Sequence, residues 1–170
     1  MRIKTKQEVP NIKVPLVNDA QWSLNEQSPQ HFTMVVFYRG LHCPVCKSYL
    51  EQLQKHVDDF SDKGIHIIAI SADSEEHAKK AYEDWEVNDV PMGYDYAIED
   101  AEKWGLYISK GIKSDEPERF FEPGLFLIRP DGTLYSASIQ SMPFARPDFD
   151  EVLKGVSYII KEDYPARGAA

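Results

Sequence analysis

The hydrophobic positions of the chain fall into short apolar runs separated by amphipathic stretches, a pattern typical of α/β proteins. Three runs predict buried strands, at residues 33–38, 65–70 and 125–128. Two stretches with apolar residues at helical spacing predict helices, at residues 43–62 and 149–160. The first of these helices lies between the first two strands.

That strand, helix and second strand together predict a βαβ unit. Residues 33–70 hold all three elements, so the two strands should be parallel, with a right-handed crossover. In sheets of this kind, active groups gather at the carboxyl ends of the strands. The residues directly after position 38 are therefore the first place to look for chemistry.

Weaker patterns predict the other elements. Residues 133–139 should return antiparallel to the strand at 125–128, after the turn signal Arg-Pro-Asp-Gly. We find no internal repeat or linker, so we predict one domain over residues 1–170. The remaining predictions are short strands at 14–17 and 21–24, helices at 74–86 and 95–104, and loops at 105–119 and 140–147.

Composition narrows the class of protein. The chain has 170 residues, 42% hydrophobic and 28% charged, which fits a globular protein with a full core. A net charge of −9 argues against binding to nucleic acid or to an anionic membrane. No apolar run approaches the roughly 20 residues of a membrane span, and the N-terminus has no apolar signal segment. We expect a cytoplasmic location.

Both cysteines lie in Cys43-Pro44-Val45-Cys46, directly after the first strand. Proline at the first helical position loses no hydrogen bond, so Pro44 predicts the start of the helix. Cys43 should then be the N-cap and Cys46 the third helical residue, near free N–H groups and the positive end of the helix dipole. This setting lowers a thiol pKa from about 8.5 to roughly 3.5–7.5.

A C-x-x-C pair in a chain expected to be cytoplasmic favours redox chemistry over a structural disulfide. A structural zinc site usually takes four ligands, and the five histidines show no H-x₃₋₅-H spacing. We therefore predict a redox-active pair with no metal and no cofactor. A scattered metal site and an inert pair are the weaker alternatives.

The order of these elements resembles the thioredoxin fold, with C-x-x-C on the first crossover and a hairpin plus helix at the end. Residues 35–46, 68–74 and 124–132 also resemble the peroxiredoxin-like AhpC/TSA (redoxin) family, and the likeness extends over about residues 8–168. The resemblance implies an α/β fold with a central mixed sheet and helices on both faces. It also implies a thiol-dependent oxidoreductase acting on hydroperoxides or disulfides.

The chain departs from this family at the motif itself. Peroxiredoxins have Pro-x-x-x-Thr/Ser-x-x-Cys, whereas an ungapped match puts Arg39 in place of Pro, Cys43 in place of Thr/Ser and Cys46 on the peroxide-reducing position. The family arginine before the late strand is also missing, because Glu122-Pro123-Gly124 stands there. A proline at that place resembles thioredoxin, where it is cis and lies against the disulfide, so Pro123 is a candidate site residue.

Two assignments of the nucleophile stay open. On capping geometry, Cys43 attacks a disulfide and Cys46 resolves it. On the family resemblance, Cys46 attacks a peroxide, becomes a sulfenic acid and condenses with Cys43. Both routes end in a Cys43–Cys46 disulfide and need an external thiol reductant of the thioredoxin or glutathione type. We favour Cys43, which should be the more exposed thiol.

Neighbouring residues are candidate supports. Arg39 either lowers a thiol pKa and orients substrate or forms a surface ion pair. His42 either stabilises a thiolate or is an exposed turn residue. Tyr38 adjoins the site, and Arg146 either closes over it or pairs with a nearby helix. A different class of function is a non-catalytic redoxin-fold module that senses redox state or holds a metal. The resemblance also allows a homodimer.

Overall fold

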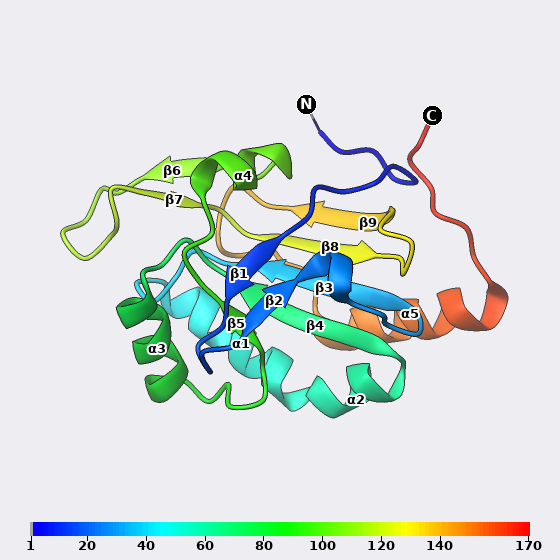
Figure 1. The fold of residues 1–170 in the computed structure, drawn as a ribbon, viewed down its shortest axis with the longest axis horizontal. Coiled ribbons are helices and arrows are strands. Elements are labelled where there is room, and N and C mark those ends of the chain that lie inside the picture. The colour runs from blue at the N-terminus through cyan, green and yellow to red at the C-terminus, as the bar shows by residue number, and fades with distance from the viewer. Residues whose placement is uncertain (1) are drawn as a thin grey trace.

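The computed structural model describes residues 2–170, built around a five-stranded mixed sheet (Figure 1). The strand order is β5-β4-β3-β8-β9. The strands are β3 (Phe32–Phe37), β4 (Ile65–Ile70), β5 (Met92–Gly93), β8 (Gly124–Ile128) and β9 (Leu134–Ile139). The three predicted apolar strands are therefore confirmed and lie side by side in the middle of the sheet.

Strand β3 is the centre of this sheet. It pairs in parallel with β4, from Phe32↔Ile65 to Phe37↔Ile70, and antiparallel with β8. All six of its residues are buried, because side chains cover both faces of the strand. The predicted βαβ unit and the predicted β8–β9 hairpin are both confirmed.

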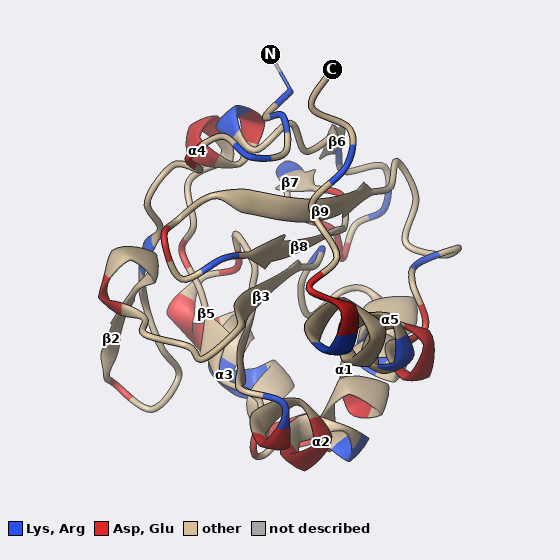
Figure 2. Cartoon of the chain, turned by 90° about the vertical axis from the view of Figure 1, so that its right-hand side faces the viewer, with Lys and Arg blue, Asp and Glu red and all other residues tan. Residues whose placement is uncertain are grey.

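Helices cover both faces of the sheet, as predicted. Figure 2 shows α4 (Ile98–Lys103) on one side and α1 (Pro44–Lys55), α2 (Val57–Asp62) and α5 (Phe149–Glu162) on the other. Helix α3 (Glu75–Asp84) packs on the same side as α1, through Ala81.

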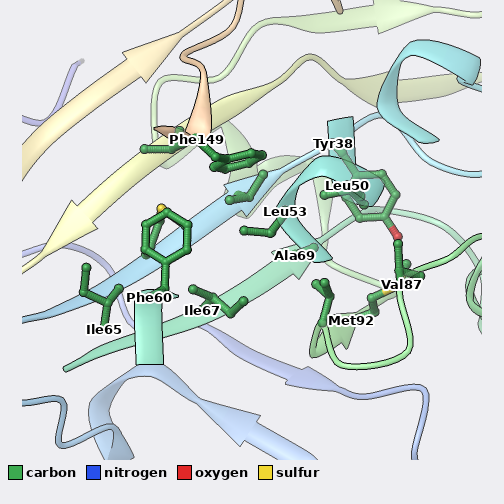
Figure 3. Packing of buried hydrophobic residues seen from close by; sticks show 14 of the residues in the cluster. Tyr38, Leu50, Leu53, Phe60, Ile65, Ile67, Ala69, Val87, Met92 and Phe149 are labelled. Atoms are coloured by element: carbon green, nitrogen blue, oxygen red, sulfur yellow. The ribbon is translucent and has the colours of Figure 1, made fainter. Parts of the chain in front are cut away.

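The core consequently has two layers. Figure 3 shows Leu50, Leu53 and Phe149 gathered over the β4 residues Ile67 and Ala69. This layer also contains both cysteines, whereas the opposite layer contains an aromatic cluster around Phe37, the last residue of β3. The Cys43–Cys46 motif therefore lies in the core and not on a surface loop.

One predicted helix is interrupted. We expected residues 43–62 to form a continuous helix, but α1 ends at Lys55 and α2 begins at Val57. Between them, His56 leaves helical geometry, with φ −113° and ψ 7°. Its imidazole contacts Asp59 and Asp150 at 3.1 and 3.5 Å, side-chain interactions that helical periodicity does not reveal.

Two short hairpins and a 3₁₀ turn complete the fold. The two short strands predicted at 14–17 and 21–24 are observed as β1 (Lys13–Pro15) and β2 (Gln21–Ser23), which pair antiparallel and are followed by the turn Leu24–Glu26. β6 (Ile108–Lys110) and β7 (Arg119–Phe121) also pair, so the predicted loop at 105–119 is wrong at both ends. In the described part of the chain, no helix has the length and apolarity needed to cross a bilayer.

Candidate active site

The turn between β3 and α1 is built from both parallel strands of the βαβ unit. Asp73, which follows β4, accepts a hydrogen bond from the Leu41 N–H at 2.8 Å. Gly40 has φ 134°, and a Cβ at that position would collide with the Asp73 carboxylate. Only glycine meets both demands, so this turn holds the start of α1 at the carboxyl end of the sheet.

Cys43 and Cys46 occupy the predicted positions at the start of α1. Cys43 is the N-cap in an extended conformation, Pro44 is the first helical residue, and the Cys43 Sγ accepts a 3.2 Å hydrogen bond from the Cys46 N–H. Both thiols are free, with exposed fractions of 3% and 0%. Cys43 is the more exposed of the two thiols, as expected, but the difference is small and both are buried, because the N-cap lies within the core layer beneath α1.

The surroundings of the two sulfurs differ in charge. Burial opposes ionisation of Cys46, yet the Cys43 thiol, the Arg146 charge and the Arg39 backbone N–H together lower the Cys46 pKa to about 6. Donation from Cys43 to the Cys46 sulfur, with burial, raises the pKa of Cys43. The geometry thus favours Cys46 as a thiolate at neutral pH and Cys43 as the thiol beside it.

Arg146 supplies the side-chain cation at this site. Its Nη2 donates to the Cys46 Sγ at 3.3 Å, and its Nε donates to the Pro143 carbonyl at 2.6 Å. The guanidinium carbon lies 4.2 Å from the centre of the Tyr49 ring. Within residues 2–170, Arg146 forms no ion pair with a carboxylate. Of the two interpretations considered for Arg146, closure over the site is the one that this arrangement favours.

The side chain of Arg39 forms an ion pair with a buried glutamate and does not hydrogen-bond either cysteine. Its side chain forms a bidentate ion pair with Glu122, at 2.8 and 2.9 Å, and Glu122 also accepts from Ser109 at 2.6 Å. The Arg39 backbone contributes to the lowered pKa of Cys46, and the Arg39 guanidinium interacts with the two cysteines through charge alone. The ion pair is partly buried, whereas the sequence suggested a surface pair, because Glu122 is only 1% exposed.

His42 and Tyr38 lie close to the motif. The His42 ring packs against Phe120 with 4.7 Å between ring centres, and its Nε2 is buried without a partner in the described structure. Burial lowers the pKa of His42, so it is a neutral ring at physiological pH. Burial raises the pKa of Tyr38, which packs on Trp85. Neither side chain provides a positive charge for a thiolate.

Pro123 lies beside Arg146. It shares a small, mostly apolar space with Tyr49, Gln140 and Arg146, and its carbonyl accepts from the Gln140 N–H at 3.0 Å. The Glu122–Pro123 peptide bond is trans, as are the other peptide bonds in the described range. The thioredoxin-like cis geometry considered for this bond is therefore absent.

Sequence reasoning missed the roles of Glu122, Asp73 and Tyr49. Each acts through a partner distant in the chain, such as Arg39, which is 83 positions from Glu122. The available signal for Glu122 was an acidic residue where the family has arginine, opposite an arginine where the family has proline. In residues 2–170, no group of three or more His, Cys, Asp or Glu side chains is placed to hold a metal.

Comparisons with known proteins give a family match. The model of the AhpC/TSA family matches residues 5–137. No sequence among curated proteins matches the chain.

Solved structures confirm the predicted thioredoxin-like fold. Peroxidoxin BcpB from Mycobacterium tuberculosis is 18% identical, with a TM-score of 0.75, covering 93% of this chain and 99% of that one. Peroxiredoxin 6 of Arenicola marina is 18% identical, with a TM-score of 0.80 and coverage of 95% and 75%. A peroxiredoxin-like protein from Aquifex aeolicus is 18% identical, with a TM-score of 0.75 and coverage of 94% and 89%.

Proposed function

Because the chain belongs to the AhpC/TSA family, we propose that it is a thiol-dependent peroxidase in which Cys46 is the nucleophile and Cys43 the resolving thiol. Membership of this family indicates thiol-dependent peroxidase activity. The observation that supports the assignment of the two cysteines is their opposite electrostatic environment. A donor thiol, a guanidinium and a backbone N–H face the Cys46 sulfur, and they lower its pKa to about 6 despite burial.

In the first step, the Cys46 thiolate attacks the terminal oxygen of a hydroperoxide. An S–O bond forms, the O–O bond breaks, and the leaving alkoxide or hydroxide takes a proton from solvent. Cys46 becomes a sulfenic acid, and the peroxide is reduced to an alcohol or water. Arg146 stabilises the thiolate and the negative charge that develops on the peroxide oxygens.

In the second step, the Cys43 sulfur attacks the Cys46 sulfenic sulfur. The S–S bond forms as the S–O bond breaks, and the thiol proton leaves with the hydroxyl group as water. Cys43 is well placed for this step, because its sulfur already accepts a hydrogen bond from the Cys46 N–H. An external dithiol of the thioredoxin type, or glutathione, then reduces the disulfide by exchange and is itself oxidised. A cytoplasmic location would supply such reductants.

Single substitutions test the two roles. Cys46→Ser should abolish peroxide consumption, because serine cannot be oxidised by this route. Cys43→Ser should consume a single equivalent of peroxide and then stop with Cys46 as a sulfenic acid, detectable by dimedone labelling and mass spectrometry. Full steady-state turnover in the Cys43→Ser, Cys46→Ser double variant would disprove the proposal.

The pH dependence of alkylation tests the assignment independently of peroxide. Because the pKa of Cys46 is lowered to about 6, iodoacetamide should label Cys46 with a rate that rises through pH 6 and is constant above pH 7. Cys43 should remain unlabelled in this range, since its pKa is raised. Preferential labelling of Cys43 would support Cys43 as the attacking thiol and therefore disulfide exchange.

A further inference from the structure

We propose that Tyr49 is a positioning residue that holds the Arg146 guanidinium on the Cys46 sulfur, so that the nucleophile and its cation are joined through one face of α1. The inference rests on the function proposed above, in which Cys46 is the nucleophile. It assigns to Tyr49 a role that neither the motif nor the family match indicates.

Helical spacing places Tyr49 beside the sulfur. Cys46 and Tyr49 are three positions apart in α1 (Pro44–Lys55), so their side chains lie on the same face. Arg146 contacts both: its Nη2 donates to the Cys46 Sγ at 3.3 Å and its guanidinium carbon lies 4.2 Å from the Tyr49 ring centre. The guanidinium plane therefore bridges a thiolate and an aromatic face, both of which attract a cation.

Tyr49 also holds the backbone next to Arg146. Its hydroxyl donates a 2.6 Å hydrogen bond to the carbonyl of Pro147. Burial raises the pKa of Tyr49, so the phenol stays protonated and keeps this donor at physiological pH. The ring itself is fixed by Phe149, whose ring centre is 4.5 Å away and which is buried at the start of α5. One tyrosine thus joins α1, Arg146 and the first turn of α5.

Arg146 depends on this support because its other restraints are few. Its segment, residues 140–147, has no helical or strand structure, and Met142 and Phe144 are 46% and 58% exposed. In the described chain no carboxylate pairs with Arg146, and its Nη1 is buried without a partner. A long arginine side chain loses rotamer entropy when it is held in one place, and apart from Tyr49 and Cys46 only the Pro143 carbonyl restrains this guanidinium among the described hydrogen bonds.

The experiment is the pH profile of Cys46 alkylation, measured by peptide mapping, in Tyr49→Leu, Tyr49→Phe and Arg146→Met. Tyr49→Leu removes the ring and the hydroxyl and should raise the midpoint by about 0.5–1 pH unit, because the cation–π contact is lost. Tyr49→Phe keeps the ring and should shift the midpoint less. Tyr158→Leu, an exposed tyrosine on α5, is the matched control and should leave the profile unchanged.

A double variant separates positioning from general stability. If Tyr49 acts through Arg146, then Tyr49→Leu should produce no additional shift when Arg146→Met is already present. An unshifted profile in Tyr49→Leu, or an equal shift with and without Arg146, would overturn the inference. Should Tyr49→Leu fail to fold, an unshifted profile in Tyr49→Phe together with unchanged exchange of the Arg146 segment would overturn it. Alkylation needs no peroxide, so it tests the role of Tyr49 alone. Failure of the peroxidase proposal would be detected separately, by measuring steady-state peroxide consumption.

Discussion

Two cysteines three positions apart acquire different chemistry from side chains that approach from other parts of the chain. The helix start places both sulfurs near backbone N–H groups, and this much follows from the position of Pro44. The Cys43 thiol lowers the pKa of Cys46, and Arg146, which is 100 positions from Cys46 in the sequence, adds a hydrogen bond to the Cys46 sulfur. Local pattern therefore predicts a reactive pair, whereas tertiary contacts decide which member carries the charge.

The Arg39–Glu122 pair illustrates the same rule, since opposite charges meet where the family has a proline and an arginine. We expect Glu122→Gln to lower the free energy of unfolding by about 3 kcal/mol, because it leaves a partly buried guanidinium without its charge partner. The side chains of Arg39 and Glu122 are 17% and 2% exposed, so solvent screens this pair only weakly. Urea denaturation at pH 7 would measure the change.

The matched control is Glu99→Gln, because Glu99 and Arg119 form a long pair of 3.9 Å between exposed side chains. We expect a loss below about 0.5 kcal/mol there. Equal effects of the two substitutions would show that the Glu122 pair contributes no more than a surface ion pair.

At the scale of elements, apolar runs predicted the three central strands because β3 and β8 are buried at every residue and β4 at every residue except His66. The helix at 149–160 was equally clear from its apolar stripe and is observed as α5. Among the short strands, β1 and β2 were predicted, whereas β5, β6 and β7 were not. The strand β5 has two residues, and β6 and β7 form a hairpin because Phe120 and Phe121 are buried against distant elements.

The segment that carries Arg146 should respond to the redox state of the pair. Oxidation to the Cys43–Cys46 disulfide removes the thiolate that Arg146 contacts, and no carboxylate in the described structure replaces it. We expect faster amide hydrogen exchange over residues 141–147 in the oxidised protein than in the reduced protein. Exchange mass spectrometry would measure this.

The β1–β2 turn at residues 18–19 is a suitable internal reference, since it is exposed and makes no contact with the cysteines. Its exchange should be the same in both redox states. Identical exchange over residues 141–147 in the two states would contradict the expectation.

In the molecule as a whole, the central strands of the sheet are apolar and most charged residues lie outside them. Figure 2 shows many acidic and basic residues on helices and loops and some on the short outer strands, while β3, β8 and β9 carry no charged side chain. The sheet joins two core layers, and the site lies where one layer reaches the carboxyl end of β3. This placement was predictable from strand order, whereas the burial of both sulfurs was not, because it depends on how α1 and α5 pack over the sheet.

The two ends of the described chain also meet across this fold. Thr5 donates to the Arg167 carbonyl at 2.6 Å, Tyr135 donates to the Tyr164 carbonyl at 2.8 Å, and Ala166 is buried in the core layer that contains the cysteines. Removing residues 164–170 should lower the free energy of unfolding by about 2 kcal/mol, through lost hydrogen bonds and burial.

Urea denaturation would measure that loss of stability. Alkylation of Cys46 should keep its pH profile in the shortened protein, because none of these tail contacts involves Cys43, Cys46 or Arg146. A shifted profile would show that the tail supports the site as well as the fold.

The position of Cys43 at the cap of the helix that carries Cys46 has a consequence for survival under stress. A sulfenic sulfur can be captured by a neighbouring thiol or attacked by a second peroxide, which gives an irreversible sulfinic acid. Here the Cys43 sulfur already accepts a hydrogen bond from the backbone N–H of Cys46, so the two sulfurs can react without a large rearrangement of the backbone. We expect the protein to withstand high peroxide concentrations without hyperoxidation, as a scavenger suited to sudden oxidative bursts.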